Sequence, residues 1–170
     1  VGGVRFYDRK EIKDILAYMR VCLQPDDEIS LKRIINVPSR GIGKRALQQL
    51  DDYKNMYGVP LWSAITEIEN IRGIQTRTKK SVASFRSLME RFVCEKIDLL
   101  PSELVKEILV ESGYLDVLEN DHSFEARSRI ENIKEFIGVV TEFEEGVGAG
   151  NGRQPLASFL DTISLETSVD

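Results

Sequence analysis

The residues best suited to chemistry lie in one short segment, where cations and glycines surround a tight turn. Residues 31–45 carry five cations and no acid, although the whole chain has a net charge of −5. Gly41 and Gly43 flank Ile42, and two cations follow directly. Glycine lets the backbone approach a partner closely, and a helix N-terminus presents free N–H groups and positive partial charge. The spacing therefore predicts a site for phosphate, with Ile42 turned inward between two helices.

Seven consecutive residues of this turn are candidate DNA contacts: Ser39, Arg40, Gly41, Ile42, Gly43, Lys44 and Arg45. The turn and its flanking helices resemble the helix-hairpin-helix DNA-binding motif. Such a site holds the sugar–phosphate backbone and reads no base edges, so binding is expected to be sensitive to salt and insensitive to sequence. The alternative is an ordinary corner between helices that needs glycine to turn and whose cations are merely solvated.

Other kinds of site have little support in the sequence. Lys44 is followed by Arg45 instead of Ser or Thr, and Pro38 occupies the first glycine position of a phosphate loop for ATP. A single histidine and no Cys/His cluster argue against a structural metal. Cys22 and Cys94 lie in helical patterns and are expected to be small buried side chains in a reducing cytoplasm.

A mostly helical fold is predicted to position the turn. Residues 30–50 form a short helix, the turn and the start of a second helix, which runs from Lys44 to Tyr57 and stops at Gly58. Asp8 and Glu11 resemble a capping box at the first long helix, and Ser30 is expected to cap the short one. Further helices are expected near residues 8–19, 60–65, 82–93, 101–113, 114–118, 124–144 and 155–164. Residues 146–152 are expected to be a mobile loop, and Val4–Tyr7 is the only hint of a strand.

Composition places the chain among soluble globular domains. Hydrophobic residues make up 42% and charged residues 30% of 170 residues, which suits one core. No apolar run could cross a bilayer and no signal peptide is visible, so a cytoplasmic protein without a membrane partner is expected. The first residue is valine, which suggests a fragment or a processed product.

The order of several segments resembles the UvrD/PcrA/Rep family of superfamily 1 ATP-dependent DNA helicases. Residues 2–14, GGVRFYDRKEIKD, are similar to the family pattern G-G-x-x-F-x-x-R-x-E-I-K-D. The match continues in residues 33–43, RIINVPSRGIG, and 129–135, RIENIKE, and it ends in PLASFL and SLE near the C-terminus. Residues 61–118 match mainly in their helical pattern.

The resemblance implies subdomain 2B, a helical insertion in the second motor domain, with its two ends close together. Residues 1–8 would belong to the edge of motor domain 2A, 9–164 to subdomain 2B, and 165–170 to the return toward the motor. The parent would use ATP and Mg to move 3′-to-5′ on single-stranded DNA. This fragment would hold no cofactor and no catalytic residue.

Double-stranded DNA and the motor subdomains are the partners that the resemblance implies. Residues 39–45 would contact the duplex ahead of the fork, and rotation of the whole subdomain could switch the parent between two orientations. Arg127 and Arg129 are second candidates for contact with DNA or the motor. Glu131 and Asn132 are expected to form a polar network that braces their helix. DNA repair, replication restart and plasmid copying all stay open as the pathway.

Two other classes of function are alternatives to a DNA-binding helicase subdomain. A helical protein–protein interaction module would suit the acidic composition and the glycine-rich segment. A helix-hairpin-helix glycosylase would need a catalytic Asp roughly 18 residues beyond the hairpin lysine, where this chain has Trp62 and no nearby Asp.

Overall fold

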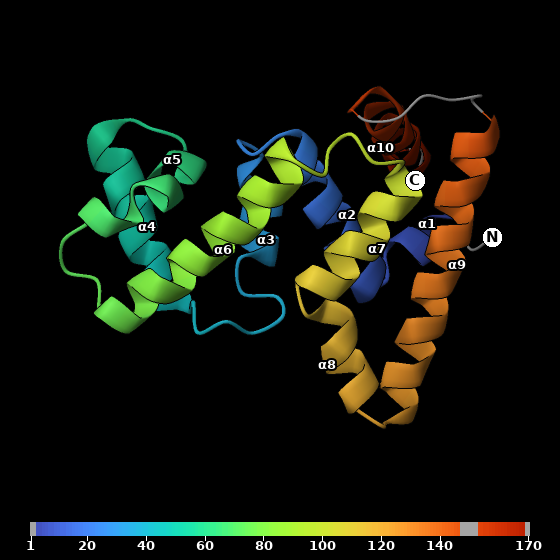
Figure 1. Cartoon of the computed structure of the whole chain (residues 1–170), viewed down its shortest axis with the longest axis horizontal. Helices are drawn as coiled ribbons and strands as arrows, with labels where there is room; N and C mark the ends of the chain where they lie inside the picture. The colour runs from blue at the N-terminus through green and yellow to red at the C-terminus, as the bar shows by residue number, and fades with distance from the viewer. Residues whose placement is uncertain (1–2, 147–152, 169–170) are drawn as a thin grey trace.

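All regular secondary structure of the described residues is helical, which confirms the mostly α fold class (Figure 1). The computed structural model describes residues 3–146 and 153–168, and these contain no strand. The helices are α1 (Gly3–Tyr7), α2 (Lys10–Leu23), α3 (Glu28–Ile34), α4 (Lys44–Tyr57), α5 (Leu61–Thr66), the 3-10 helix η1 (Ile68–Asn70), α6 (Thr76–Cys94), α7 (Pro101–Glu111), α8 (Tyr114–Asn120), α9 (Phe124–Gly146) and α10 (Arg153–Ser168). None of these helices is long and apolar enough to cross a membrane.

Helix α2 is the centre of the molecule. It packs against α3, α6, α7, α9 and α10. Ten of its 14 residues are buried, and Ile12, Met19 and Val21 are completely buried. Elements from both halves of the fold enclose it, so α2 joins the two halves.

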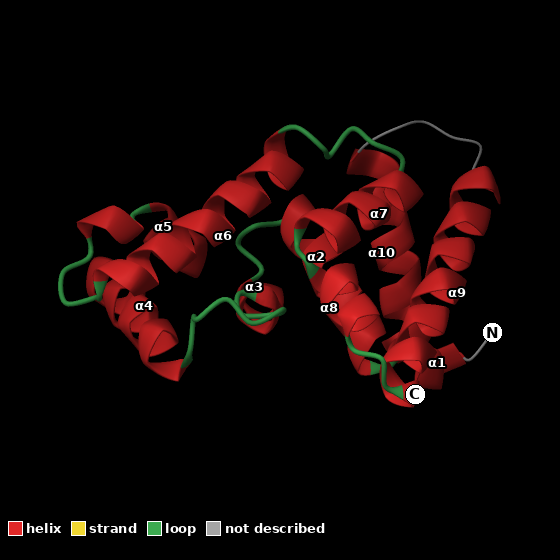
Figure 2. Cartoon of the chain, turned by 60° about the horizontal axis from the view of Figure 1, so that its bottom comes forward, coloured by secondary structure: helices red, strands yellow, loops and turns green. Residues whose placement is uncertain are grey.

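Two lobes lie on either side of α2 and α3 (Figures 1 and 2). One lobe contains α4, α5, η1 and the first part of α6, and α5 packs against both α4 and α6. The other contains α1 and α7–α10, with α7, α8 and α9 in mutual contact. The segment between α3 and α4, which contains the predicted turn, belongs to the edge of the first lobe.

The two ends of the described chain lie together, as the resemblance implied. Helices α1 and α10 pack against each other. The pKa of Tyr7 in α1 is raised mainly by burial and also by the nearby carboxylate of Glu166 in α10. The strand suggested for Val4–Tyr7 is wrong, because this segment is helix α1. Its neighbouring residues Phe6 and Tyr7 are both buried, whereas a strand would point them to opposite faces. The expected boundary at residues 164 and 165 falls inside α10, which continues without a break.

The predicted helix ends are only partly correct. The capping box is wrong, because Arg9 is the N-cap of α2 and makes no side-chain cap. The cap expected from Ser30 is also wrong, because α3 is capped by Asp27, whose carboxylate accepts bonds from the backbone N–H and the hydroxyl of Ser30. Gly58 ends α4 in a left-handed conformation with φ of 61°, as predicted. Most of the expected loop over residues 146–152 lies outside the described residues.

The two cysteines differ in environment. Cys22 is buried in α2, and burial raises the pKa of its thiol. Cys94 is exposed at the end of α6, so its expected burial is wrong. It occupies the last position of α6, next to the exposed C-cap Glu95.

Candidate nucleic-acid interface

The predicted turn has an apolar anchor and an open backbone. Ile42 is 1% exposed and packs into the core, as its position between two glycines predicted. Gly41 and Gly43 on either side are exposed. Gly41 has φ of 80°, a conformation that side chains rarely adopt, so glycine is needed there for the turn itself. The turn therefore faces solvent with its backbone while a single side chain fixes it to the lobe.

Gly43 has a different role from Gly41. Its φ is −92°, and a Cβ built on it would meet nothing within 4 Å. Neither backbone strain nor internal packing requires glycine at this position. The open space in front of the Gly43 backbone is available to an external group.

Asn36 organises the inner side of the turn. Its carboxamide oxygen accepts hydrogen bonds from the backbone N–H of Arg40 at 2.7 Å and of Ile42 at 3.1 Å. Sequence reasoning missed this residue, although Asn side chains often bond to nearby backbone in turns. Asn36 thus pairs the N–H groups of Arg40 and Ile42 within the chain.

The N–H groups that stay unpaired belong to Gly41, Gly43 and the first turn of α4. Within the described part of the chain, the N–H groups of Gly41 and Gly43 have no hydrogen-bond partner. Gly43 is the N-cap of α4, and no side chain caps this helix. The first N–H groups of an α-helix lack an intrahelical acceptor. Several free donors therefore lie at or beside one helix N-terminus, where the helix dipole also favours an anion.

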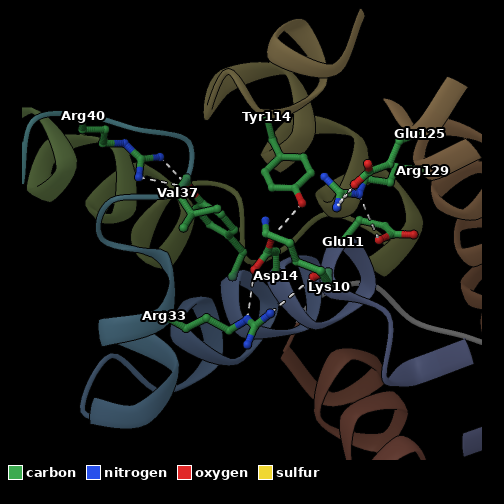
Figure 3. A network of polar contacts seen from close by, with 10 residues as sticks. Lys10, Glu11, Asp14, Arg33, Val37, Arg40, Tyr114, Glu125 and Arg129 are labelled. Atoms are coloured by element: carbon green, nitrogen blue, oxygen red, sulfur yellow. Dashed lines mark hydrogen bonds and ion pairs between the residues drawn. The ribbon is translucent and has the colours of Figure 1, made fainter. Parts of the chain in front are cut away.

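Arg40 supports the turn from the inside. Its guanidinium donates to the backbone carbonyls of Ile34 at 2.8 Å, Val37 at 3.1 Å and Ile35 at 3.2 Å, and also to the Tyr18 hydroxyl. It lies over the Phe85 ring, 5.1 Å from the centroid. Figure 3 shows this side chain directed at Val37. The Arg40 charge is thus used to satisfy the carbonyls at the end of α3, and it is not presented to solvent in the way predicted from the sequence.

The remaining candidates in the turn are free. Ser39, Lys44 and Arg45 are exposed. Lys44 and Arg45 form no ion pair with any described residue, whereas Lys32 of α3 and Lys54 of α4 share Glu28 and Asp51. The two cations at the N-terminus of α4 therefore keep their full charge available to an external anion.

A buried network holds α3, and hence the beginning of the turn, against α2. The Asp14 carboxylate is 2% exposed and accepts bonds from Arg33 Nε at 2.9 Å, Lys10 Nζ at 2.8 Å and Tyr114 Oη at 2.7 Å. Figure 3 shows Asp14 at the point where these three side chains meet. Burial, together with the Asp14 carboxylate, raises the pKa of Tyr114. No signal in the sequence distinguished Asp14 from a surface acid.

Arg127 and Arg129 do not join the turn. Both lie on α9 in the other lobe, far from the start of α4 (Figure 1). Arg127 is exposed, while Arg129 pairs with Glu125 at 2.6 Å and approaches Glu11 at 3.9 Å.

Asn132 braces α9 against α2, as predicted. Its carboxamide donates to the buried Glu11 carboxylate at 2.7 Å and accepts a bond from Arg9 at 2.6 Å. Glu131 takes no part in this network, because it is exposed and pairs only with Lys134, three residues along the helix.

Taken together, the fold and the site define an all-helical domain with a cationic glycine turn at the edge of one lobe. The family described as UvrD-like helicase C-terminal domain matches residues 1–170, and the chain belongs to this family. It is 40% identical over 170 residues to the ATP-dependent DNA helicase PcrA of Staphylococcus epidermidis and 39% identical to that of Bacillus subtilis strain 168. The match covers 100% of this chain but only 23% and 22% of those two proteins.

The turn lacks the phosphate-loop residues, as the sequence already indicated. Within residues 3–146 and 153–168, no group of three or more His, Cys, Asp or Glu side chains could hold a metal ion.

Proposed function

We propose that this chain is the duplex-DNA-binding subdomain 2B of a 3′-to-5′ ATP-dependent DNA helicase, with residues 9–164 as the subdomain and both ends joined to the motor. The main support is the turn at residues 39–45. Its outer N–H groups and two cations are free, while Ile42 and Arg40 hold it rigidly from within. ATP and Mg would be bound by motor segments outside this chain. The curated relatives are ATP-dependent DNA helicases, and this chain corresponds to less than a quarter of their length.

The proposed contact is with phosphates and not with bases. Backbone N–H groups at a helix N-terminus match the acceptor oxygens of a phosphate, and Lys44 and Arg45 add charge beside them. Neither the amides nor the flexible cations could discriminate among base edges. The duplex would therefore be held in any sequence, as an unwinding enzyme requires.

Removal of the two free cations tests the electrostatic part of this proposal. Replacing Lys44 and Arg45 with Ala is expected to reduce the slope of log affinity against log salt by about two, since each phosphate contact on duplex DNA contributes about 0.9. Fluorescence anisotropy of a labelled duplex, titrated at several salt concentrations, measures the slope. Replacing the exposed cations Lys13 and Lys106 with Ala removes the same charge elsewhere and is expected to leave the slope unchanged.

A substitution at Gly43 separates binding from stability. Gly43→Asp places an N-cap carboxylate on α4, which should raise the free energy of unfolding by a few tenths of a kcal/mol. The same carboxylate would occupy the free N–H groups and repel phosphate, so duplex affinity should fall by at least about tenfold. Asn55→Asp adds an equal charge on an exposed position of α4 near its other end and serves as the control. Unchanged affinity in the Gly43→Asp protein would exclude the amides as the phosphate site.

One observation favours a second candidate, a protein-interaction module. Met56 and Tyr57 are 76% and 61% exposed beside a surface cavity of about 450 Å³ that Tyr53 and Arg72 also line. Exposed apolar side chains around a hollow are typical of protein contacts. This module would show no dependence of duplex affinity on Lys44 and Arg45, so the salt titration distinguishes the two candidates.

A further inference from the structure

A second segment of the chain contains as many cations as residues 31–45, again without an acid. Residues 72–89 contain five cations and no acid. Two of the five are used internally, because Arg86 forms two bonds to Glu69, at 2.6 and 2.7 Å, and Lys79 donates to the Glu69 carbonyl. The Arg86 guanidinium lowers the pKa of Glu69 to about 2. Arg77 and Lys80 are exposed and have no such partner in the described part of the chain.

Arg77 and Lys80 lie on one face of α6 together with two small hydroxyl residues. Steps of three and four residues lead from Arg77 to Lys80, Ser84, Ser87 and Arg91, which places all five side chains along one stripe. Ser84 and Ser87 are exposed and too short to keep a phosphate away from the helix. Each hydroxyl can donate a hydrogen bond to a phosphate oxygen. The stripe thus combines charge, donors and room for a nucleic-acid backbone.

The stripe is hollowed along its length and continues to the turn. Lys80, Ser84, Ser87 and Arg91 line one shallow depression, and Ser84 and Arg91 also line a second one that reaches Arg40 and Ser81. A Cβ built on Gly41 would lie 3.8 Å from the Ser81 hydroxyl, so the turn and α6 are in direct contact. The cationic face ends at Arg91, which Glu111 neutralises at 3.0 Å.

The stripe on α6 is long enough to follow a phosphate strand. Arg77 and Ser87 are ten residues apart, which corresponds to roughly 15 Å along a helix. The grooves of B-form DNA are about 6 and 12 Å wide. The stripe is therefore longer than a groove is wide, and with Ser81 beside Gly41 it extends the cationic surface beyond the turn.

We propose that the α6 face formed by Arg77, Lys80, Ser84 and Ser87 binds the second phosphate strand of a duplex whose first strand lies on the turn at residues 39–45. This inference rests on the proposed function and adds a reason for preferring duplex over single-stranded DNA. A single strand would occupy the turn alone, whereas a duplex would occupy both surfaces.

The test compares duplex and single-stranded oligonucleotides of equal length, bound to the whole chain at low salt. Arg77→Gln together with Lys80→Gln is expected to lower duplex affinity about tenfold and its salt slope by about two, with single-strand affinity unchanged. Lys13→Gln together with Lys106→Gln is the control of equal charge. Circular dichroism melting checks that each variant is folded. Glutamine is a good helix former, so α6 should be retained.

The possible results distinguish a failure of this inference from a failure of the proposed function on which it rests. An equal loss on both oligonucleotides would overturn the second-strand assignment, because α6 would then serve the first strand. Unchanged duplex affinity would also overturn it, and the proposed function would survive if Gly43→Asp still abolished binding. Absence of binding by the unmodified chain to either oligonucleotide would overturn both. Only a selective loss on duplex DNA supports the inference.

Discussion

Replacement of Asp14 with Ala is expected to lower the free energy of unfolding by about 3 kcal/mol. The Asp14 carboxylate is 2% exposed and accepts three bonds, from Lys10, Arg33 and Tyr114. Its loss leaves the buried Tyr114 hydroxyl without an acceptor and removes the tie between α2, α3 and α8. The expected loss is at the lower end of the range for a broken buried pair, because the Lys10 and Arg33 side chains are 54% and 37% exposed and can regain water.

Urea denaturation followed by circular dichroism measures this change. Asp116→Ala is a suitable control, since Asp116 is exposed on α8 and should change stability by less than about 0.5 kcal/mol. Tyr114→Phe, alone and combined with Asp14→Ala, isolates the bond between the two side chains. A coupling energy near zero in that cycle would show that the carboxylate and the hydroxyl do not support each other.

Replacement of Arg40 with Lys is expected to lower the free energy of unfolding by about 2–3 kcal/mol, although the charge is kept. An ammonium group cannot reach the carbonyls of Ile34, Ile35 and Val37 while also bonding Tyr18, since these acceptors match the planar fork of a guanidinium. Duplex affinity should fall as well, because the turn loses its internal support. Thermal melting and the anisotropy titration measure the two effects.

The matched control for Arg40 is Arg45→Lys in the same turn. Arg45 is exposed and unpaired, so this replacement keeps the charge and disturbs no internal bond. Both stability and duplex affinity should stay unchanged. If Arg40→Lys behaved in the same way, Arg40 would act through its charge toward the ligand, as the sequence first indicated, and not through its contacts with the carbonyls.

The helices and the inward side chain of the turn could be predicted from the sequence because both depend on local patterns. Apolar residues at steps of three and four predicted the long helices, and Gly58 predicted the end of α4. Two glycines around one apolar residue predicted the burial of Ile42. The family resemblance, which the match over residues 1–170 confirms, depended on the order of short segments and needed no contact information.

Roles that depend on partners distant in sequence could not be predicted. Asp14 and Tyr114 are 100 residues apart, and Glu11 and Asn132 are 121 apart, so no local pattern relates them. The spacing of Asp8 and Glu11 predicted a cap, but the Glu11 carboxylate is buried and accepts a bond from Asn132 of α9. The strand hint at Val4–Tyr7 failed for the same reason, since packing against α10 favours a helical turn there.

The sequence by itself determined where charge, glycine and apolar residues occur, and these suffice for helices, for the turn and for membership of the family. The tertiary structure decided which cations are free. Arg40 is bonded to carbonyls of its own turn and Arg86 to Glu69, whereas Lys44, Arg45, Arg77 and Lys80 form no ion pair within the described part of the chain. The physical reason is that a charge is available to a ligand only when folding has brought no acceptor to it, and acceptors arrive from every part of the chain.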